Sequence, residues 1–224
     1  MTLALLHTSP VHVPAFDALR DADHPGLALR HLVREGLLRR AREHGPGAVA
    51  DEIRGLLADA VAGGASAVLC TCSTIGGVAE AASAAVGVPV LRVDRPMAAE
   101  AVRRGRVVVL AALESTLSPT LELLAEETGK AEKTGEAGDT GEVGERPVGV
   151  RTVLVDGAWE RFTAGDRDGF LDLVATAADA VTDADAIVLA QASMADAASR
   201  TGTRIPVLSS PRSGLAAAVA AARR

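Results

Sequence analysis

Short apolar runs alternate with longer segments of helical period along the whole chain. The short runs are rich in Val and Leu and are bounded by turn residues, which is typical of β-strands. The predicted strands are 3–7, 27–33, 67–71, 88–93, 107–112, 150–155, 186–190 and 207–209. The predicted helices are 16–20, 48–62, 75–85, 116–127, 167–181, 194–200 and 213–222. Strands that alternate with helices in this way indicate an α/β fold with parallel sheets and helices on both faces.

The pattern occurs twice. "SAVLCTCSTIGGVAEAA" (66–82) aligns without a gap with "DAIVLAQASMADAAS" (185–199), and "VPVLRVD" (88–94) aligns with "IPVLSSP" (205–211). The sequence therefore predicts two pseudo-symmetric, flavodoxin-like units, 1–100 and 101–224, each a four-stranded parallel sheet flanked by helices. Ligands of open α/β folds bind at the carboxyl ends of the strands, so we expect the site in a cleft between the units.

Composition restricts the possible partners. Hydrophobic residues make up 48% and charged residues 23% of the chain, as in globular proteins. Three Phe, one Trp and no Tyr provide few platforms for stacking nucleotide bases, and a net charge of −6 does not suit a phosphate backbone. We therefore expect no nucleic-acid partner. The segment 129–147 is rich in Gly, Glu and Lys and predicts a mobile surface loop.

The location is inferred from what the sequence lacks. No apolar run approaches the ~20 residues of a membrane span, and "MTLALLHTSP" has no basic region before its apolar run, so it predicts a first strand rather than a signal peptide. The two cysteines, Cys70 and Cys72, have one residue between them, which fits neither a stable disulfide nor a zinc or redox pair. We expect a reduced, cytoplasmic protein with no membrane partner. The spacing of the five histidines predicts no metal site.

Cys72 has the most informative position. It follows a buried strand and precedes a helix, where the backbone N–H groups of Ser73, Thr74 and Ile75 lack partners within the helix. Such a helix start attracts a carboxylate and is expected to lower the pKa of a thiol below its usual ~8.5. The alternative is that Cys72 is a small buried apolar residue, which is the interpretation we favour for Cys70.

The chain resembles the Asp/Glu racemase superfamily, which includes amino-acid and hydantoin racemases, maleate isomerase and arylmalonate decarboxylase. The resemblance rests on the duplicated layout, on "TCSTIGG" (71–77) and on "VLAQASMA" (188–195). It covers nearly the whole chain except 129–147 and implies an enzyme that uses no cofactor. In the racemases of this family one cysteine from each half flanks the substrate α-carbon, and the two exchange protons with it on opposite faces.

By position, Cys72 matches the first catalytic thiol, and Gln191 occupies the place of the second. Gln191 has no proton to exchange near neutral pH, which disfavours a two-thiol racemase mechanism. The resemblance then leaves three reactions open: decarboxylation, double-bond isomerisation and one-thiol racemisation, with Ser193, His7 or water in place of the missing thiol. A small-carboxylate binding protein that has lost catalysis is the alternative.

The remaining candidates follow other strand ends. The predicted substrate-binding residues are His7, Ser9, Ser73, Thr74, Ser115, Thr116, Gln191, Ala192 and Ser193. A structural histidine is an equally good interpretation of His7, and the sequence assigns no role to His31. The resemblance also implies a small carboxylic acid as substrate and a homodimer.

Overall fold

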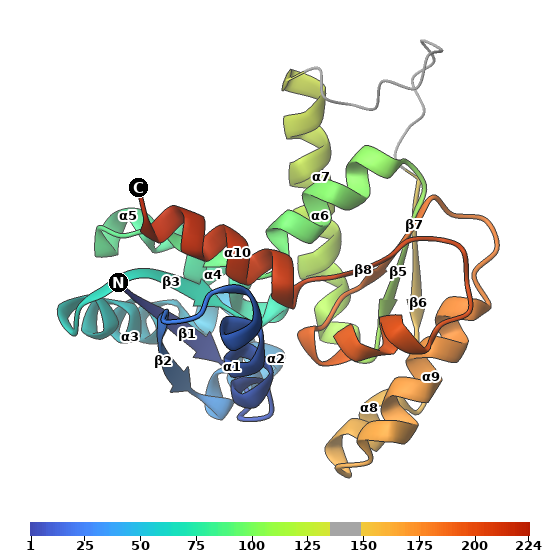
Figure 1. Cartoon of the computed structure of the whole chain (residues 1–224), viewed down its shortest axis with the longest axis horizontal. Helices are drawn as coiled ribbons and strands as arrows, with labels where there is room; N and C mark the ends of the chain where they lie inside the picture. Colours follow the sequence, from blue (N-terminus) through green and yellow to red (C-terminus); the bar gives the residue numbers. More distant parts are fainter. Residues whose placement is uncertain (135–148) are drawn as a thin grey trace. The chain divides into compact units, whose positions relative to one another are not determined.

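The computed structural model describes residues 1–134 and 149–224, which form two compact units (Figure 1). Unit 1 contains Met1–Asp94 and Pro211–Arg224, and unit 2 contains Arg95–Ser210. These units differ from the predicted division at residue 100 in the placement of two helices. The helix at Arg95–Arg104 packs in unit 2, and the C-terminal helix returns to unit 1.

Unit 1 is built around a parallel sheet with strand order β2-β1-β3-β4. Its elements are β1 (Thr2–His7), α1 (His12–Asp23), β2 (Ala28–Val33), α2 (Glu35–His44), the 3-10 helix η1 (Pro46–Val49), α3 (Ala50–Ala62), β3 (Ala65–Cys70), α4 (Ser73–Ala81), α5 (Ser83–Val86), β4 (Val90–Arg92) and α10 (Pro211–Ala222). Because the strands are parallel, the loops that follow β1 and β3 leave the sheet at the same edge.

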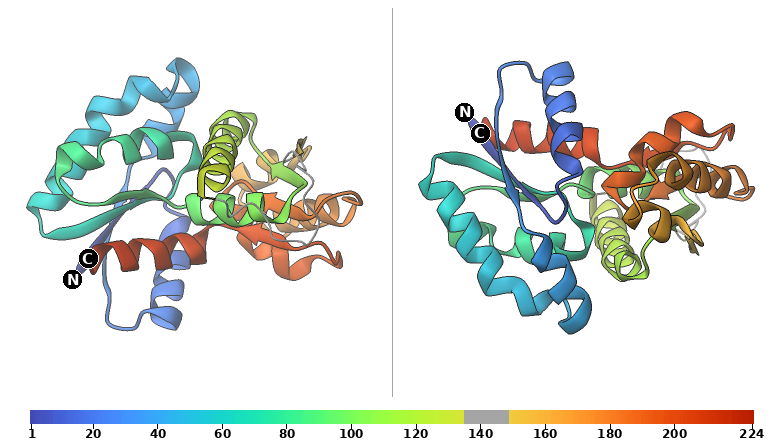
Figure 2. Two further views of the ribbon diagram at one scale, coloured as in Figure 1. Left: turned by 90° about the horizontal axis from the view of Figure 1, so that it is seen from above. Right: turned by 90° about the horizontal axis from the view of Figure 1, so that it is seen from below.

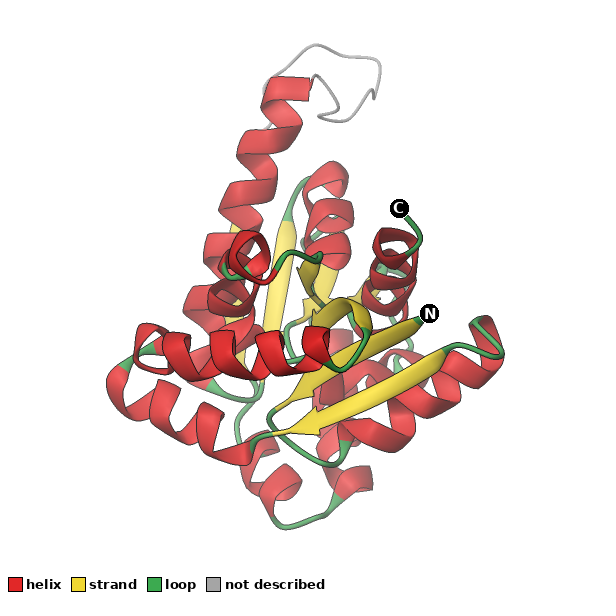
Figure 3. Cartoon of the chain, turned by 90° about the vertical axis from the view of Figure 1, so that its left-hand side faces the viewer, coloured by secondary structure: helices red, strands yellow, loops and turns green. Residues whose placement is uncertain are grey.

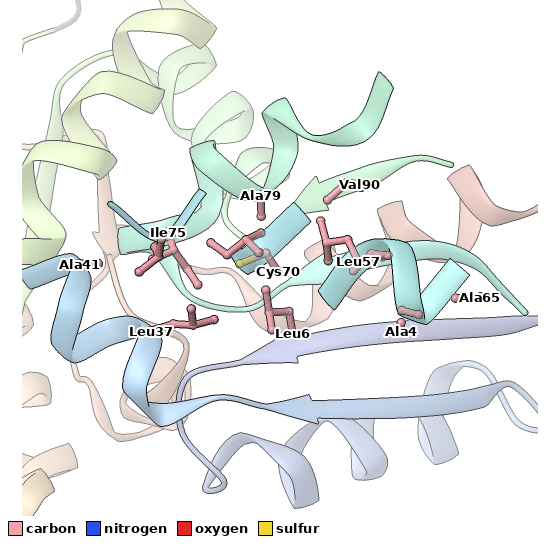
Figure 4. Close-up of a cluster of buried hydrophobic side chains, with 14 residues drawn as sticks. Ala4, Leu6, Leu37, Ala41, Leu57, Ala65, Cys70, Ile75, Ala79 and Val90 are labelled. Carbon is pink, nitrogen blue, oxygen red and sulfur yellow. The ribbon is translucent and has the colours of Figure 1, made fainter. Parts of the chain in front are cut away.

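Helices cover both faces of this sheet because its central strands are apolar on both sides. Leu6 and Cys70 point toward α2, α3 and α4, where they join the cluster drawn in Figure 4. Leu5 and Leu69 point to the opposite face and pack against α1 and α10. The contact between these two helices can be followed in Figure 2.

Unit 2 repeats this architecture with strand order β6-β5-β7-β8, also parallel. Its elements are α6 (Arg95–Arg104), β5 (Val107–Ala111), the 3-10 helix η2 (Glu114–Thr116), α7 (Leu117–Thr134), β6 (Val150–Leu154), α8 (Ala158–Thr163), α9 (Arg167–Asp179), β7 (Ala186–Leu189), the 3-10 helix η3 (Ala192–Arg200) and β8 (Val207–Ser209). One face of the sheet packs against α8, α9 and η3, and the other against α6 and α7. Figure 3 shows the strands in yellow among the helices.

The predicted fold class and all eight predicted strands are confirmed. Three helices, α2, α6 and α8, were not predicted, and the helix expected at 194–200 is the 3-10 helix η3. The loop prediction for 129–147 is wrong at its start, because α7 continues to Thr134, while 135–147 lies outside the described residues. Lys130 pairs with Glu127 at 2.7 Å, an i,i+3 contact that supports this last part of α7. Within the described ranges, no helix is long and apolar enough to cross a membrane.

Candidate active site

Cys72 stands where β3 gives way to α4. Its backbone is extended (φ −113°, ψ 117°) and occupies the N-cap position, so α4 begins with the next residue, Ser73. The residue is partly exposed, and its side chain also packs against the apolar cluster between the sheet and α2–α4. The sequence predicted this position at the strand end.

The protonation state of Cys72 differs from the prediction. Burial raises the pKa of the thiol, which opposes the expected lowering at a helix start. The hydroxyl groups of Thr8 and Thr74 and the backbone N–H groups of Thr74 and Ile75 act in the other direction by stabilising the thiolate, but desolvation dominates. The prediction of a lowered pKa is therefore wrong, because the side chain lies against apolar core as well as against the helix start. At neutral pH Cys72 carries its proton.

Cys70 is a core residue, as the sequence suggested. Its side chain is completely buried between Leu6, Ile75 and Ala79 in the cluster of Figure 4. Burial raises the pKa of its thiol, whose Sγ lies 3.7 Å from the carbonyl oxygen of Cys72. Of the two thiols, only that of Cys72 is accessible.

Other predicted residues gather at the same edge of unit 1. Ser73 and Thr74 are buried in the first turn of α4, and Ser9 is partly exposed in the loop after β1. His7 ends β1 and is completely buried. The structure therefore brings His7, Ser9, Ser73 and Thr74 to the edge that carries Cys72.

A buried ion pair at the end of β4 packs against α4. Arg92 at the end of β4 holds Asp94 with two hydrogen bonds, Nε to Oδ1 at 2.8 Å and Nη2 to Oδ2 at 3.0 Å. The exposed fractions of the two residues are 3% and 1%. Gly76 lies against this arginine, since a Cβ atom at Gly76 would come within 3.1 Å of Nε. The ion pair and the glycine fix the first turns of α4 against the sheet.

The corresponding edge of unit 2 carries an amide in place of a thiol. Gln191 follows β7 as the N-cap residue of η3, and its Oε1 accepts a hydrogen bond from the backbone N–H of Ala112 at 2.7 Å. The carbonyl end of the side chain is thereby anchored to the end of β5. Its Nε2 donates to no residue that the structure describes, so two N–H donors are available for a ligand.

The remaining predicted residues of unit 2 lie at this second edge. Ser115 and Thr116 belong to η2 after β5, and Ala192 and Ser193 begin η3. Thr116 is buried, whereas the other three are partly exposed. The hydroxyl oxygen of Ser115 is inaccessible to solvent and has no partner in the described part of the chain.

Sequence reasoning missed His31. Its ring lies 5.1 Å from that of His7 between ring centroids, and the two histidines share a hydrogen bond of 2.8 Å. The positions of His7 and His31 on two predicted neighbouring strands were the available signal. The exposed appearance of "LRHLVR" concealed it.

The described residues include no group of three or more His, Cys, Asp or Glu placed to hold a metal ion. Arg212 pairs with Asp23 on the surface of unit 1. In each unit taken by itself, hydroxyl and N–H donors are the groups at this edge that suit an anionic ligand.

Comparisons with known proteins agree with this layout. The family model for Asp/Glu/hydantoin racemase matches residues 15–222. Among solved structures, the aspartate racemase of Picrophilus torridus superposes with a TM-score of 0.65 at 15% identity, over 99% of this chain and 94% of that one. The glutamate racemase of Aquifex pyrophilus superposes with a TM-score of 0.62 at 12% identity, over 96% of this chain and 82% of that one. Arylmalonate decarboxylase superposes with a TM-score of 0.58 at 20% identity, over 99% of this chain and 92% of that one. No curated protein sequence matches the chain.

Proposed function

Because this chain belongs to the Asp/Glu/hydantoin racemase family, we propose that it catalyses cofactor-free proton transfer at the carbon next to the carboxylate of a small acid. Cys72 is the proton-transferring group. The observation that carries this proposal is the position of Cys72 at the start of α4, partly exposed and surrounded by hydrogen-bond donors. The scarcity of aromatic residues favours an aliphatic acid as substrate.

The raised pKa of Cys72 makes proton delivery the favoured step. In a decarboxylation the bond between the α-carbon and a carboxylate breaks, carbon dioxide leaves, and the electron pair stays on the substrate as an enediolate. The Cys72 S–H then gives its proton to the α-carbon, and the resulting thiolate is reprotonated from solvent. Racemisation and thiolate addition to a double bond both begin with a deprotonated thiol, which this environment disfavours.

The anionic intermediate would be stabilised by donors that the fold already orients. The N–H groups of Thr74 and Ile75 are directed by the start of α4, and the hydroxyl groups of Thr8 and Thr74 lie beside the same sulfur. Donors of this kind act in the transition state because they need no reorganisation. Removing one typically costs ~10²–10³ in rate.

Gln191 makes the proposed chemistry asymmetric. Its carbonyl oxygen is held by Ala112, so the amide is fixed as a hydrogen-bond donor and supplies no proton near neutral pH. One thiol therefore delivers a proton from one side only, and we expect a single enantiomer as product. The same residue supports the alternative function, a carrier that binds a small carboxylate and has lost turnover.

A panel of aliphatic malonates, amino acids and hydroxy acids in deuterated water tests the proposal. We expect deuterium at the α-carbon of one enantiomer with release of carbon dioxide, read by NMR. Cys72→Ala should lower the rate by about 10²- to 10⁴-fold, the contribution typical of a general acid. Cys70→Ala is the matched control, because Cys70 is buried and inaccessible to substrate.

Other labelling patterns separate the remaining reactions. Deuterium in both enantiomers would indicate racemisation instead of decarboxylation. Binding of an acid without labelling, unchanged in Cys72→Ala, would contradict enzymatic function and favour the carrier.

A further inference from the structure

A row of hydrogen-bonded side chains runs from the surface of α1 to the inner end of β1. Asp17 Oδ1 lies 3.3 Å from His31 Nε2, and His31 Nδ1 lies 2.8 Å from His7 Nε2. His7 Nδ1 in turn lies 2.8 Å from Thr71 Oγ1. We call these four residues the histidine chain. Its outer end is open to solvent, with the side chains of Asp17 and His31 39% and 16% exposed, while His7 and Thr71 are buried.

The inner end of the histidine chain joins the two segments that meet at the thiol. His7 immediately precedes Thr8, whose hydroxyl group is one of those that favour the thiolate of Cys72, and Thr71 immediately precedes Cys72 itself. The backbone N–H of Thr71 also donates to the carbonyl oxygen of Leu6 at 3.0 Å. The His7–Thr71 hydrogen bond therefore ties the residue before Thr8 to the residue before Cys72.

The donors and acceptors of the histidine chain allow two hydrogen-bond arrangements. A carboxylate only accepts hydrogen bonds, so His31 Nε2 carries a proton toward Asp17 in both. The Thr71 hydroxyl has one proton and two acceptors in reach, His7 Nδ1 at 2.8 Å and the carbonyl oxygen of Leu6 at 3.2 Å. It donates to only one of them at a time.

In the first arrangement Thr71 donates to His7 Nδ1, and His7 Nε2–H donates to His31 Nδ1. In the second, His31 carries one additional proton on Nδ1 and donates it to His7 Nε2. His7 then donates from Nδ1 to Thr71, and the Thr71 hydroxyl turns to Leu6. His7 stays neutral in both and changes only its tautomer, and the two arrangements differ by one proton.

We propose that the histidine chain positions the catalytic thiol through Thr71, and that one proton on His31 selects which of the two arrangements the chain adopts. The role assigned to the thiol rests on the proposed function. His7 and Thr71 are positioning residues, since neither is a reacting group. A proton at the outer end thereby changes the direction of the hydroxyl group of Thr71, the residue that precedes Cys72.

The charged surroundings permit an additional proton at His31. Asp17 faces it directly, and Arg20 lies 3.3 Å from the same carboxylate oxygen. His12 stacks on His7, with ring centroids 6.3 Å apart, and both are kept neutral because burial lowers their pKa values to about 4 and about 3. We therefore assign the additional proton to the ring beside Asp17.

The first test measures how fast iodoacetamide alkylates Cys72 from pH 5 to 9, with mass spectrometry assigning the adduct. Thr71→Val removes the hydroxyl and keeps the shape, whereas Thr71→Ser keeps the hydroxyl. We expect Thr71→Val to slow alkylation at a given pH about 3- to 10-fold, the value of one net hydrogen bond, and Thr71→Ser to restore it. In the parent protein the pH profile should contain a second step, which His31→Gln removes and His44→Gln, at an exposed histidine, retains.

The second test needs no variant. Nitrogen-15 NMR of the ring of His7 should report the Nε2–H tautomer at high pH and the Nδ1–H tautomer at low pH. One tautomer throughout, or equal alkylation of the Thr71→Val and Thr71→Ser proteins, would overturn the inference even if the enzyme turns over an acid. If no acid of the panel were turned over while alkylation and the His7 tautomer changed as expected, the proposed function would be refuted and the inference about the histidine chain would stand.

Discussion

Burial decides the protonation of the titratable residues at the edge of unit 1. Desolvation raises the pKa of Cys72 and lowers those of His7 and His12, so all three are neutral in the folded protein near pH 7. A helix start and a histidine pair would each suggest charged groups if judged by local sequence alone. The apolar cores against which these residues pack reverse that expectation.

The neutral histidines make the protein sensitive to acid. Unfolded histidine takes up a proton near pH 6.5, whereas folded His7 does so only near pH 3, so the unfolded state binds more protons between these values. The free energy of unfolding is therefore complete above pH 6.5 and decreases as the pH falls below it. We expect a slope of up to about 1.4 kcal/mol per pH unit from His7, measured by urea unfolding at pH 5, 6 and 7.5.

His7→Gln should reduce this slope, although it also lowers stability at every pH. His44→Gln is the control, because His44 is exposed and its substitution should leave the slope unchanged. Equal slopes in the parent protein and His7→Gln would contradict the assignment of acid sensitivity to His7.

At the scale of elements, α4 depends on how closely it approaches β4. Two adjacent glycines, Gly76 and Gly77, lie near the start of α4 and have different neighbours. A Cβ atom at Gly76 would lie 3.1 Å from Nε and 3.2 Å from Cβ of Arg92, whereas one at Gly77 would lie 3.5 Å from Nη1, an ordinary contact. The glycine at 76 is needed for packing, and the one at 77 is not.

Substituting alanine at each glycine separates packing from helix propensity. Both substitutions gain about 1 kcal/mol of propensity, which cancels in the comparison. Because Arg92 is held by Asp94 and cannot move away freely, we expect Gly76→Ala to be less stable than Gly77→Ala by about 1–3 kcal/mol. Urea denaturation measures the difference, and equal midpoints would show that the arginine gives way without cost.

At the scale of the whole molecule, the C-terminal helix belongs to the first unit. Leu215, Ala218 and Val219 of α10 are buried in the cluster that contains Leu3 and Leu5 of β1. Gly214 permits this contact, since a Cβ atom there would lie 2.4 Å from the carbonyl oxygen of Val93. Unit 1 therefore needs both ends of the chain to close its core.

Deletion of 211–224 should expose this face of the sheet in unit 1. We expect loss of the cooperative unfolding of unit 1, followed by near-UV circular dichroism and amide hydrogen exchange, because several fully buried side chains are removed together. Deletion of the exposed pair Arg223 and Arg224 alone should leave unfolding unchanged. Protection of β1 and β3 in the longer deletion would show that α10 is dispensable.

Much of the fold follows from the sequence because parallel strands buried on both faces appear as continuous apolar runs. This reason applies to the central strands β1, β3, β5 and β7, whereas the edge strands β2 and β6 are partly exposed and were predicted from their Val- and Leu-rich runs. Helix α2 was missed because only Leu37 and Ala41 of its ten residues are buried, a weak apolar pattern among many charges. The sequence determined the position of Cys72 at a strand end and of Gln191 at its repeat.

Only the tertiary structure decided what those positions do chemically. The protonation of Cys72 depends on the apolar cluster behind it, and the orientation of Gln191 depends on a hydrogen bond to Ala112, 79 residues away in sequence. The pairing of His7 with His31, and of His7 with Thr71, spans 24 and 64 residues. Desolvation and hydrogen-bond direction depend on distances between remote segments, and a linear pattern of residue types does not contain those distances.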